Sequence, residues 1–159
     1  MFRPMRRANR AIPDEAAKLL LKQSRRGVLA VNGDDGYPYA IPVNYFYEET
    51  AGKIYFHGAK AGQKVDALKR SDKVCFTVYG NEHTVPGEEW APYVQSTVVF
   101  GRCHLIADAA ATEARVRELA QKYYPGPEEV EAELVKYLQG VQLYEITIEH
   151  LTGKQIQEK

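Results

Sequence analysis

Small residues and lysines connect an apolar run to a helical one between Phe56 and Lys64 (FHGAKAGQK). Gly58, Ala59 and Gly62 would let the backbone approach a ligand closely, and a helix that begins here would present N–H groups without acceptors inside the helix. Lys64 adds a positive charge, so the segment is suited to hold a phosphate group. The spacing differs from GxxxxGKS or GxxxxGKT, which disfavours a nucleoside-triphosphate loop, and an ordinary solvated strand-to-helix connection would have a similar composition.

A second candidate segment, from Tyr37 to Tyr45 (YPYAIPVNY), is rich in aromatic residues and carries two prolines. Proline cannot donate to a β-ladder, so Pro38 and Pro42 imply an edge, a bulge, or a wall that faces something other than a strand. Asn44 offers an amide donor and a carbonyl acceptor beside the aromatic side chains. A flat heteroaromatic ring with a hydrogen-bonding edge would suit this wall, although a half-buried edge strand of a barrel would show the same residues.

A third candidate segment contains the single tryptophan of the chain and runs from Trp90 to Ser96 (WAPYVQS). Trp90 and Ser96, with Tyr93 between them, would place a large ring and a hydroxyl at the mouth of a strand. The alternative is a surface loop anchored by one large side chain, because tryptophan is usually well buried.

The cysteines and histidines have no spacing typical of a metal site. Cys75 and Cys103 each lie in an apolar, strand-like run, and we expect both to be buried reduced thiols. The histidines are too scattered along the chain to supply a set of zinc ligands, so we expect no metal site. They stand at positions His57, His83, His104 and His150.

Hydrophobic periodicity predicts the elements that must position these segments. Hairpin-type neighbours dominate and no βαβ unit repeats, which predicts a mainly β (α+β) fold: an antiparallel barrel of about six strands with helices outside. A turn is expected at Asp34-Asp35-Gly36 and a loop over residues 80–92. The first expected helix has Ile12, Ala16, Leu19, Leu20 and Gln23 on one face. The expected strands cover 27–31, 37–47, 53–57, 74–79, 93–107 and 141–150, and the later expected helices cover 65–70, 109–124 and 128–138.

Length and composition fit one compact domain, since 45% of the 159 residues are hydrophobic and 11% are aromatic. The 21 Lys and Arg residues balance the 21 Asp and Glu residues, which argues against a protein that binds polyanions. No stretch approaches the roughly 20 apolar residues of a membrane span, and the N-terminus lacks the apolar core of a secretion signal. We expect a single cytoplasmic domain over 1–159, with a basic arm at 1–11 and a polar tail at 152–159.

The arginines of the N-terminal arm allow two interpretations. Arg3, Arg6, Arg7 and Arg10 could contact nucleic acid, or the arm could dock on a surface of its own chain or of a partner. The absence of net charge on the chain favours docking, and we expect no nucleic-acid partner.

Read together, several stretches resemble the nitroimidazole-resistance (Nim) branch of the pyridoxamine 5′-phosphate oxidase-like flavoproteins. They are RRANRAI at 6–12, GYPYAIPVNY at 36–45 and IYFHGAKAGQK at 54–64, continued by LKRSDKVCF at 68–76 and the run 96–101. The resemblance extends from about Arg6 to the LTGK ending at Lys154. The order and separation of these stretches carry it, because none is specific alone.

The resemblance implies a six-stranded split β-barrel that forms a homodimer and holds one FMN in each of two clefts at the subunit interface. By similarity, the loop from His57 through Gly58, Ala59 and Gly62 would meet the FMN phosphate, with Lys64 as its cationic contact. The flavin ring would lie against Pro42, Val43, Asn44 and Tyr45 and near His57, and the segment of Trp90, Tyr93 and Ser96 would close the cleft from the partner chain.

Two positions depart from the pattern of the branch. Asn9 stands where the arm more often has an acid, and Gly58 stands where a serine is common, so one hydroxyl for the phosphate is missing.

The resemblance also implies an FMN-dependent oxidoreductase that reduces a small acceptor such as a nitroaromatic compound, with His57 as a candidate proton donor. Oxidation of pyridoxamine 5′-phosphate is a competing activity, but residues 140–159 contain no arginine for the substrate phosphate. A third possibility is a barrel that binds flavin without turnover, or that binds haem through His57 or His150.

Overall fold

Alternating apolar and polar residues form the strands of one antiparallel sheet, and amphipathic segments form helices around it. The structure is a computed structural model, and it describes residues 1–157. In this part of the chain the strands are β1 (Arg26–Asn32), β2 (Pro38–Asn44), β3 (Phe46–Glu48), β4 (Lys53–Gly58), β5 (Lys73–His83), β6 (Tyr93–Ile106) and β7 (Gln142–Gln157). The helices are α1 (Asp14–Gln23), α2 (Gln63–Arg70), α3 (Ala109–Tyr123) and α4 (Pro127–Tyr137), with short 3₁₀ turns at Ala8–Arg10, Asp34–Gly36 and Leu138–Gly140.

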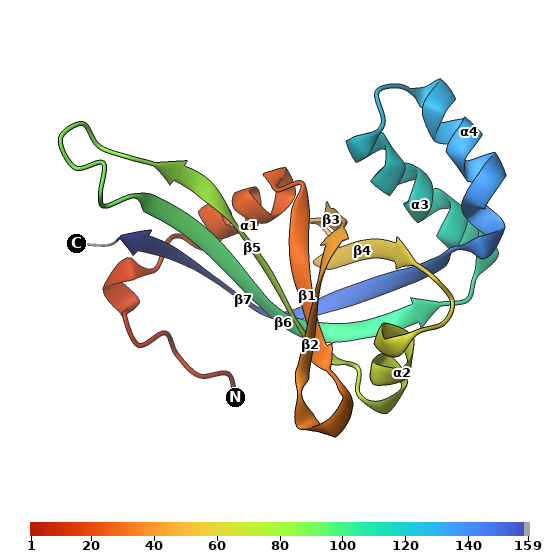
Figure 1. Cartoon of the computed structure of the whole chain (residues 1–159), viewed down its shortest axis with the longest axis horizontal. Coiled ribbons are helices and arrows are strands. Elements are labelled where there is room, and N and C mark those ends of the chain that lie inside the picture. Colours follow the sequence, from red (N-terminus) through yellow and green to blue (C-terminus); the bar gives the residue numbers. More distant parts are fainter. Residues whose placement is uncertain (158–159) are drawn as a thin grey trace.

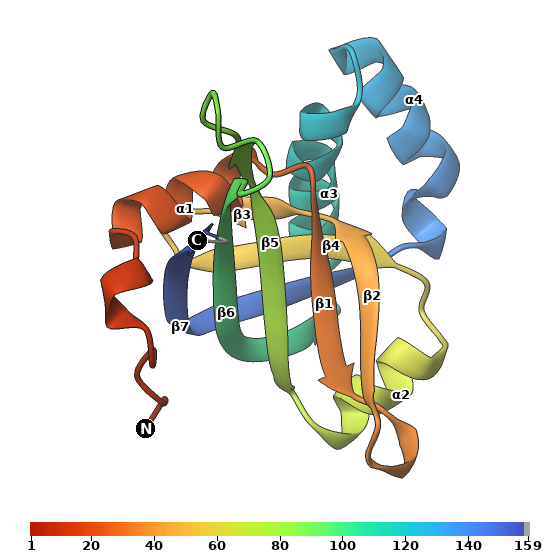
Figure 2. The same cartoon turned by 60° about the vertical axis from the view of Figure 1, so that its left-hand side comes forward.

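The sheet closes on itself because the chain passes directly from one of its edges to the other. The strand order is β2-β1-β5-β6-β7-β4-β3, so β2 and β3 lie at opposite edges although only Tyr45 separates them in sequence. In Figure 2, β1, β2 and β5 run nearly upright, and β4 and β7 cross them at a steep angle. This arrangement confirms the expected antiparallel split barrel, with seven strands instead of six in the described part of the chain.

The expected strand over 37–47 breaks at Tyr45 because this residue leaves the ladder to fill the core. Its side chain is fully buried and packs edge-on against the Phe76 ring, with 4.9 Å between the ring centroids. The Tyr45 hydroxyl donates to the carbonyl oxygen of Leu21, at the end of α1. The Tyr45 backbone N–H donates to the hydroxyl of Tyr123 over 2.8 Å, so its hydrogen bond goes to α3 and not to a strand.

The turn between β1 and β2 forms where it was expected. Asp35 and Gly36 both have positive φ angles, of 54° and 79°, which aspartate tolerates and glycine adopts freely. The two strands then pair from Arg26 opposite Asn44 to Asn32 opposite Pro38. The strand that carries both prolines is therefore an edge strand, as their missing N–H groups require.

Helix α1 covers one open end of the barrel, with a buried face different from the expected one. Ala17, Leu20 and Leu21 are buried against the sheet, whereas Leu19 is 51% exposed. Helices α3 and α4 form a hairpin on the outside, visible at the right of Figure 1. They bury a second hydrophobic cluster against β4 and β7: Tyr55, Val116, Ala120, Val130, Leu134 and Leu143.

The segment expected as a polar tail continues β7. Thr152 lies opposite Val98 and Gln157 lies opposite Tyr93, so residues 152–157 extend the ladder with β6. Residues 158 and 159 of that expected tail lie outside the described residues. Strand β5 likewise runs to His83, into the segment expected as a loop. Both extensions pair with the first half of β6, so this end of the sheet is a three-stranded ribbon of β5, β6 and β7.

The N-terminal arm docks on its own chain. The Phe2 ring stacks on His150, with centroids 4.6 Å apart, and lies 5.7 Å from Phe100. The N–H of Ile12 donates to the carbonyl of Gly153, which ties the end of the arm to β7. None of the helices in residues 1–157 combines the length and hydrophobicity of a membrane span.

Candidate functional site

An open cavity of about 520 Å³ lies at the split in the barrel, where the edge strand β2 approaches the end of β4. A volume of this size is typical of small-molecule sites. The residues that line it come from β2, from the end of β4 and from the first turn of α2: Ile41, Pro42, Val43, Asn44, His57 and Lys64. Five of these six were expected from the sequence, in two segments that the fold brings together.

Lys64 brings a positive charge to this cavity without a carboxylate to balance it. Its Nζ atom lies 4.6 Å from the centroid of the Tyr144 ring and 5.3 Å from that of Phe56. No ion pair between residues 1–157 includes Lys64. Burial lowers the pKa of Lys64 below its ordinary value. A half-buried ammonium with aromatic neighbours and no counter-charge is suited to bind an anion.

The loop before α2 is anchored at several points. The Tyr144 hydroxyl donates to the carbonyl of Ala59 over 2.7 Å, and Lys60 Nζ donates to the carbonyl of Gln139 over 2.6 Å. Gly62 has φ of 123°, a conformation that residues with a Cβ rarely adopt, and α2 begins at the next residue. A Cβ on Gly58 would lie 2.6 Å from Lys64 Nζ, so this glycine leaves room for the ammonium.

The two lysines of this loop therefore differ in what they contact. The Lys60 ammonium is held by a backbone carbonyl of the Leu138–Gly140 turn, whereas the Lys64 ammonium lies beside the cavity. The first N–H groups of α2 lie next to Lys64 and have no acceptors within the helix. The end of the cavity at α2 thus combines a cation, backbone donors and a helix N-terminus, which together fit a phosphate group.

His57 lies between this cavity and a smaller apolar one. The smaller cavity, of about 70 Å³, is enclosed by the α3–α4 hairpin and by His57, with Val116, Leu134 and Tyr137 among its lining residues. Partial burial, and secondarily the charge of Lys64, lower the pKa of His57 below its ordinary value, while part of the side chain stays in contact with solvent. The lowered pKa favours the uncharged imidazole, in which one ring nitrogen is a donor and the other an acceptor.

Tyr45 does not take the place expected for it. Its ring is fully buried among core residues, and its hydroxyl donates a hydrogen bond to the carbonyl of Leu21. The Tyr45 side chain therefore supports the barrel from inside, and the wall of the cavity ends at Asn44.

Trp90, Tyr93 and Ser96 do not reach the cavity of their own chain. They belong to the β5–β6 hairpin and the start of β6, which project on the opposite side of the barrel from α2 in Figure 1. The Trp90 side chain is 70% exposed, and the Tyr93 ring stacks on His83 with centroids 5.1 Å apart. A large exposed ring on a projecting hairpin is available for contact with a second molecule.

Sequence reasoning did not single out Ile41 or Tyr144. Ile41 lies inside the second candidate segment, and its alternation with Val43 is the signal that could have included it. Tyr144 lies 80 residues beyond Lys64 in the sequence, so only the fold places its ring next to the ammonium.

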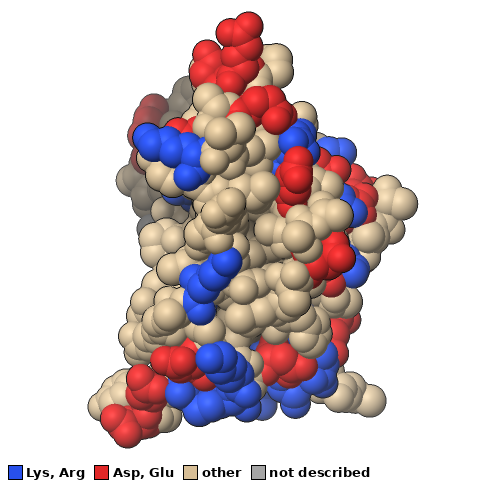
Figure 3. All heavy atoms as spheres, turned by 90° about the vertical axis from the view of Figure 1, so that its right-hand side faces the viewer, with Lys and Arg blue, Asp and Glu red and all other residues tan. Residues whose placement is uncertain are grey.

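The face that carries α2 and the α3–α4 hairpin is largely uncharged across its middle. Figure 3 shows acidic and basic side chains gathered toward the upper and lower parts of this face, with a broad band of other residues between them. Basic side chains are sparse in that band.

An antiparallel barrel that is split at β2, with an anion-suited cavity in the split, defines a split-barrel fold. The chain belongs to the pyridoxamine 5′-phosphate oxidase family, whose family model matches residues 13–155. This match confirms the resemblance seen in the sequence at the level of the family. A search of the curated proteins found no match.

Solved structures with the same fold include flavin-related proteins. A proposed 5-nitroimidazole antibiotic resistance protein of Bacteroides thetaiotaomicron aligns with a TM-score of 0.77 and 18% identity, over 92% of this chain and 87% of that one. A FAD-binding protein of Mesorhizobium loti aligns with a TM-score of 0.65 and 20% identity, over 92% and 96%. A FAD and haem binding protein of Mycobacterium smegmatis aligns with a TM-score of 0.70 and 19% identity, over 94% and 73%. At these identities the comparison establishes the shared split-barrel fold.

Proposed function

We propose that the protein binds FMN in the cavity between β2, β4 and α2. The observation that carries this proposal is the half-buried Lys64 ammonium. It forms no ion pair within residues 1–157 and lines the same cavity as the edge strand β2. The phosphate would contact Lys64 and the first N–H groups of α2, and the flat ring would lie against Pro42, Val43 and Asn44. The family match and the FAD-binding proteins of the same fold support a flavin as the ligand.

We further propose that the site is completed by a second copy of the chain. The cavity is open on one side, and the Trp90 ring is exposed on a hairpin that cannot reach the cavity of its own chain. A homodimer in which this hairpin covers the partner's cavity would bury both features at once. The segment of Trp90, Tyr93 and Ser96 is thus assigned to the cofactor site of the other chain.

We propose that the reaction is the reduction of a small acceptor, with a nitroaromatic compound as the leading candidate. The fold similarity to a proposed 5-nitroimidazole antibiotic resistance protein supports this acceptor class. FMN, when bound, supplies the hydride and electron transfer. The chain holds the phosphate at Lys64, orients the ring along β2, and offers the ring N–H of His57 as a hydrogen-bond donor beside the acceptor.

The cytoplasm is the proposed location, because Cys75 and Cys103 are both free thiols and a reducing compartment keeps them so. The pyridoxamine 5′-phosphate activity implied by the name of the family is disfavoured, because enzymes with that activity typically carry an arginine in a C-terminal substrate motif and residues 140–159 contain none.

The experiment that tests the proposal is an absorbance spectrum from about 300 to 700 nm of the purified protein, before and after addition of FMN. Flavin bands that heat denaturation releases into the supernatant would support non-covalent FMN binding. Reduction of 5-nitroimidazoles by the reduced holoprotein would then support the proposed reaction. A Soret band, or no uptake of added FMN, would overturn the flavin assignment.

A further inference from the structure

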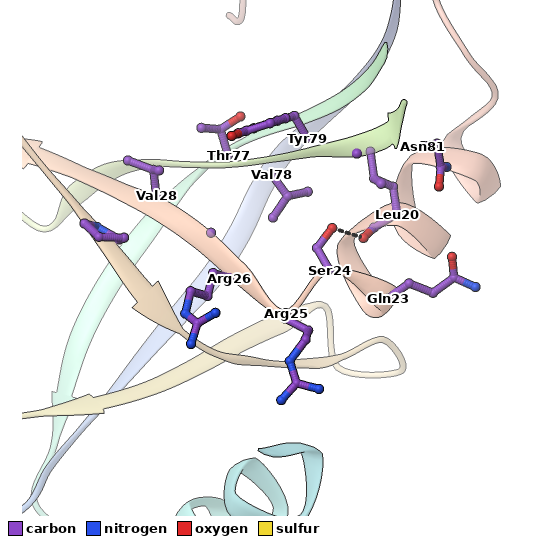
Figure 4. Close-up of a pocket in the computed structure, with 13 residues that line it drawn as sticks. Leu20, Gln23, Ser24, Arg25, Arg26, Val28, Thr77, Val78, Tyr79 and Asn81 are labelled. Atoms are coloured by element: carbon purple, nitrogen blue, oxygen red, sulfur yellow. Dashed lines mark hydrogen bonds between the residues drawn. The ribbon is translucent and has the colours of Figure 1, made fainter. Parts of the chain in front are cut away.

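A second large cavity, of about 530 Å³, adjoins the flavin cavity on the side of α1. Figure 4 shows that Thr77 and Tyr79 lie along one side of it and Arg25 and Arg26 along the other, and the half-buried Val28 also lines it. The Tyr79 ring is 73% exposed, so one face of an aromatic ligand could stack on it. The cavity thus has an aromatic side and a cationic side.

The cationic side is held in place by contacts with α3. The Arg25 guanidinium lies 5.4 Å from the centroid of the Tyr123 ring, and the Tyr123 hydroxyl donates to the carbonyl of Arg25 over 2.5 Å. Lys122, the residue before Tyr123 in α3, donates through Nζ to the carbonyls of Ser24 and Tyr45 over 2.6 and 3.1 Å. Three cations from two separate elements are therefore gathered at the turn between α1 and β1.

Among the described residues, no carboxylate is paired with these cations. No ion pair within residues 1–157 includes Arg25, Arg26 or Lys122. The nearby acids are engaged elsewhere, since Glu49 pairs with Lys22 and Glu118 pairs with Arg115. Like charges held close together repel one another, and a bound anion would relieve that repulsion.

The cluster lies at the edge of the flavin cavity. Arg26 is directly opposite Asn44 in the β1–β2 ladder, so their side chains share one face of the sheet at a spacing of about 5 Å. Pro42 lines both cavities. A molecule that places an anionic group at Arg26 can therefore extend its ring along β2 to the flavin site.

We propose that Arg25 and Arg26 form a second anion site, which binds the phosphate or carboxylate of an aromatic molecule that exchanges electrons with the flavin. This inference rests on the proposed flavin binding. It adds that the molecule reacting with the flavin carries a negative charge. The anionic molecule is either the electron donor, as a phosphorylated dihydronicotinamide, or the acceptor, as an aromatic carboxylate. A single arginine guanidinium can bind either a phosphate or a carboxylate through two parallel N–H···O bonds.

The test compares charged probes with neutral probes of similar shape, on wild-type protein and on the Arg25→Gln/Arg26→Gln variant. For the acceptor, 4-nitrobenzoate is compared with 4-nitrobenzamide by calorimetry, on both flavin-loaded and flavin-free protein. For the donor, NADPH is compared with 1-benzyl-1,4-dihydronicotinamide by the rate of flavin reduction as a function of donor concentration. Arg6→Gln/Arg7→Gln, which removes the same two charges from adjacent exposed residues of the N-terminal arm, is the matched control.

We expect the double variant to weaken binding of one charged probe about 10- to 100-fold, the range of lost charge-assisted hydrogen bonds. Binding of the neutral probes, and binding of all probes to the Arg6→Gln/Arg7→Gln protein, should change by less than about twofold. Which charged probe responds identifies the donor or the acceptor. Single Arg26→Gln, which removes no contact seen in the fold, provides the same readout if the double variant is unstable.

Equal losses for charged and neutral probes, or no loss for either charged probe, would overturn the anion site. Loss of bound FMN from the double variant at unchanged thermal stability would also overturn it, because the arginines would then belong to the flavin site. Charge-selective binding to flavin-free protein that never takes up FMN would support the anion site and overturn the proposed flavin function.

Discussion

The Lys64 ammonium lies 4.6 Å from the centroid of the Tyr144 ring, and the hydroxyl of the same tyrosine holds the carbonyl of Ala59 over 2.7 Å. One side chain from β7 therefore positions both the cation and the loop of the proposed phosphate site. The ring faces the charge, which favours the protonated lysine, while the hydroxyl fixes the backbone from which the anion would accept hydrogen bonds.

Replacement of Lys64 should weaken FMN binding without unfolding the protein. In Lys64→Gln the phosphate loses a charge-assisted contact, which corresponds to about a 10- to 100-fold rise in the dissociation constant. Titration of flavin-free protein with FMN, followed by quenching of flavin fluorescence, measures this constant. Lys60→Gln is the control, because the Lys60 ammonium contacts the carbonyl of Gln139 and does not line the cavity. Equal effects of the two substitutions would contradict the assignment of Lys64.

Gly62→Ala should distort the same loop through the backbone. At a φ of 123° a Cβ is strained, at a cost of about 1–3 kcal/mol, and the start of α2 would shift to relieve it. We expect a lower thermal midpoint together with weaker FMN binding. Gly140→Ala is the control, because a Cβ there meets no atom within 4 Å and its φ is not positive. Full FMN affinity in Gly62→Ala would argue that the phosphate binds elsewhere.

Tyr45→Phe should destabilise the fold although it removes a single oxygen. The buried carbonyl of Leu21 would lose its donor, which costs about 1–3 kcal/mol when no water can replace it. The urea midpoint measured by circular dichroism reports this loss. Tyr37→Phe, at a side chain 75% exposed, should leave the midpoint unchanged. FMN affinity of the folded Tyr45→Phe protein should stay within about twofold, because this hydroxyl points into the core.

Mixing two inactive variants should restore flavin binding if the site is shared between chains. Lys64→Gln and Trp90→Ala homodimers would each have a defect in both sites. A mixed dimer would have one site with both substitutions and one site with neither. Co-refolding the two variants should therefore recover high-affinity FMN binding in about one site per mixed dimer. No recovery, in mixtures that size-exclusion chromatography with light scattering shows to be dimeric, would mean that Trp90 does not complement Lys64 of another chain.

The stability contributed by Lys122 should change with pH. Burial, and secondarily the charge of Arg25, lower the pKa of Lys122 from 10.5 to about 8. Between pH 8 and 10.5 the unfolded chain holds this proton and the folded chain does not, so the free energy of unfolding rises with pH in this window. The other groups that face Lys122 are Tyr45 and Tyr123, and Lys22 and Glu118 across a shallow pocket.

Those groups remain in Lys122→Gln, so the difference between the wild type and this variant isolates the lysine. Urea unfolding at pH 7 and pH 10 should show the wild type gaining stability relative to Lys122→Gln as the pH rises. A constant difference would mean that the Lys122 ammonium has its ordinary pKa.

The sequence predicts those parts of the site that depend on local signals. Glycines and lysines between a strand and a helix indicate the phosphate loop, and Pro42 beside Asn44 indicates an unpaired wall. Each segment folds locally as expected. Their meeting across one cavity depends on the closure of the sheet between β2 and β4, and no local pattern contains this information.

Several features could not be predicted because a distant partner decides them. Tyr45 continues the inward alternation of Tyr39, Ile41 and Val43, so its burial follows from the strand pattern. Its hydrogen-bond partners, the Leu21 carbonyl and the Tyr123 hydroxyl, lie on distant helices that only the fold brings to it. Leu19 and Leu21 are equally apolar, and the position of α1 on the barrel decides which is buried. Lys122 and Arg25 lie almost 100 residues apart in sequence, so their gathering at one turn is a property of the fold.

The junction between β2 and β3 also determines where the chain can change in length. A single residue joins strands at opposite edges of the sheet, and each strand has a fixed register with its neighbour. One inserted residue would force a one-step slip in either ladder and would turn its inward side chains to the outside. Insertions are therefore excluded at this junction and accommodated at the tip of the β5–β6 hairpin, where homologous chains should differ most in length.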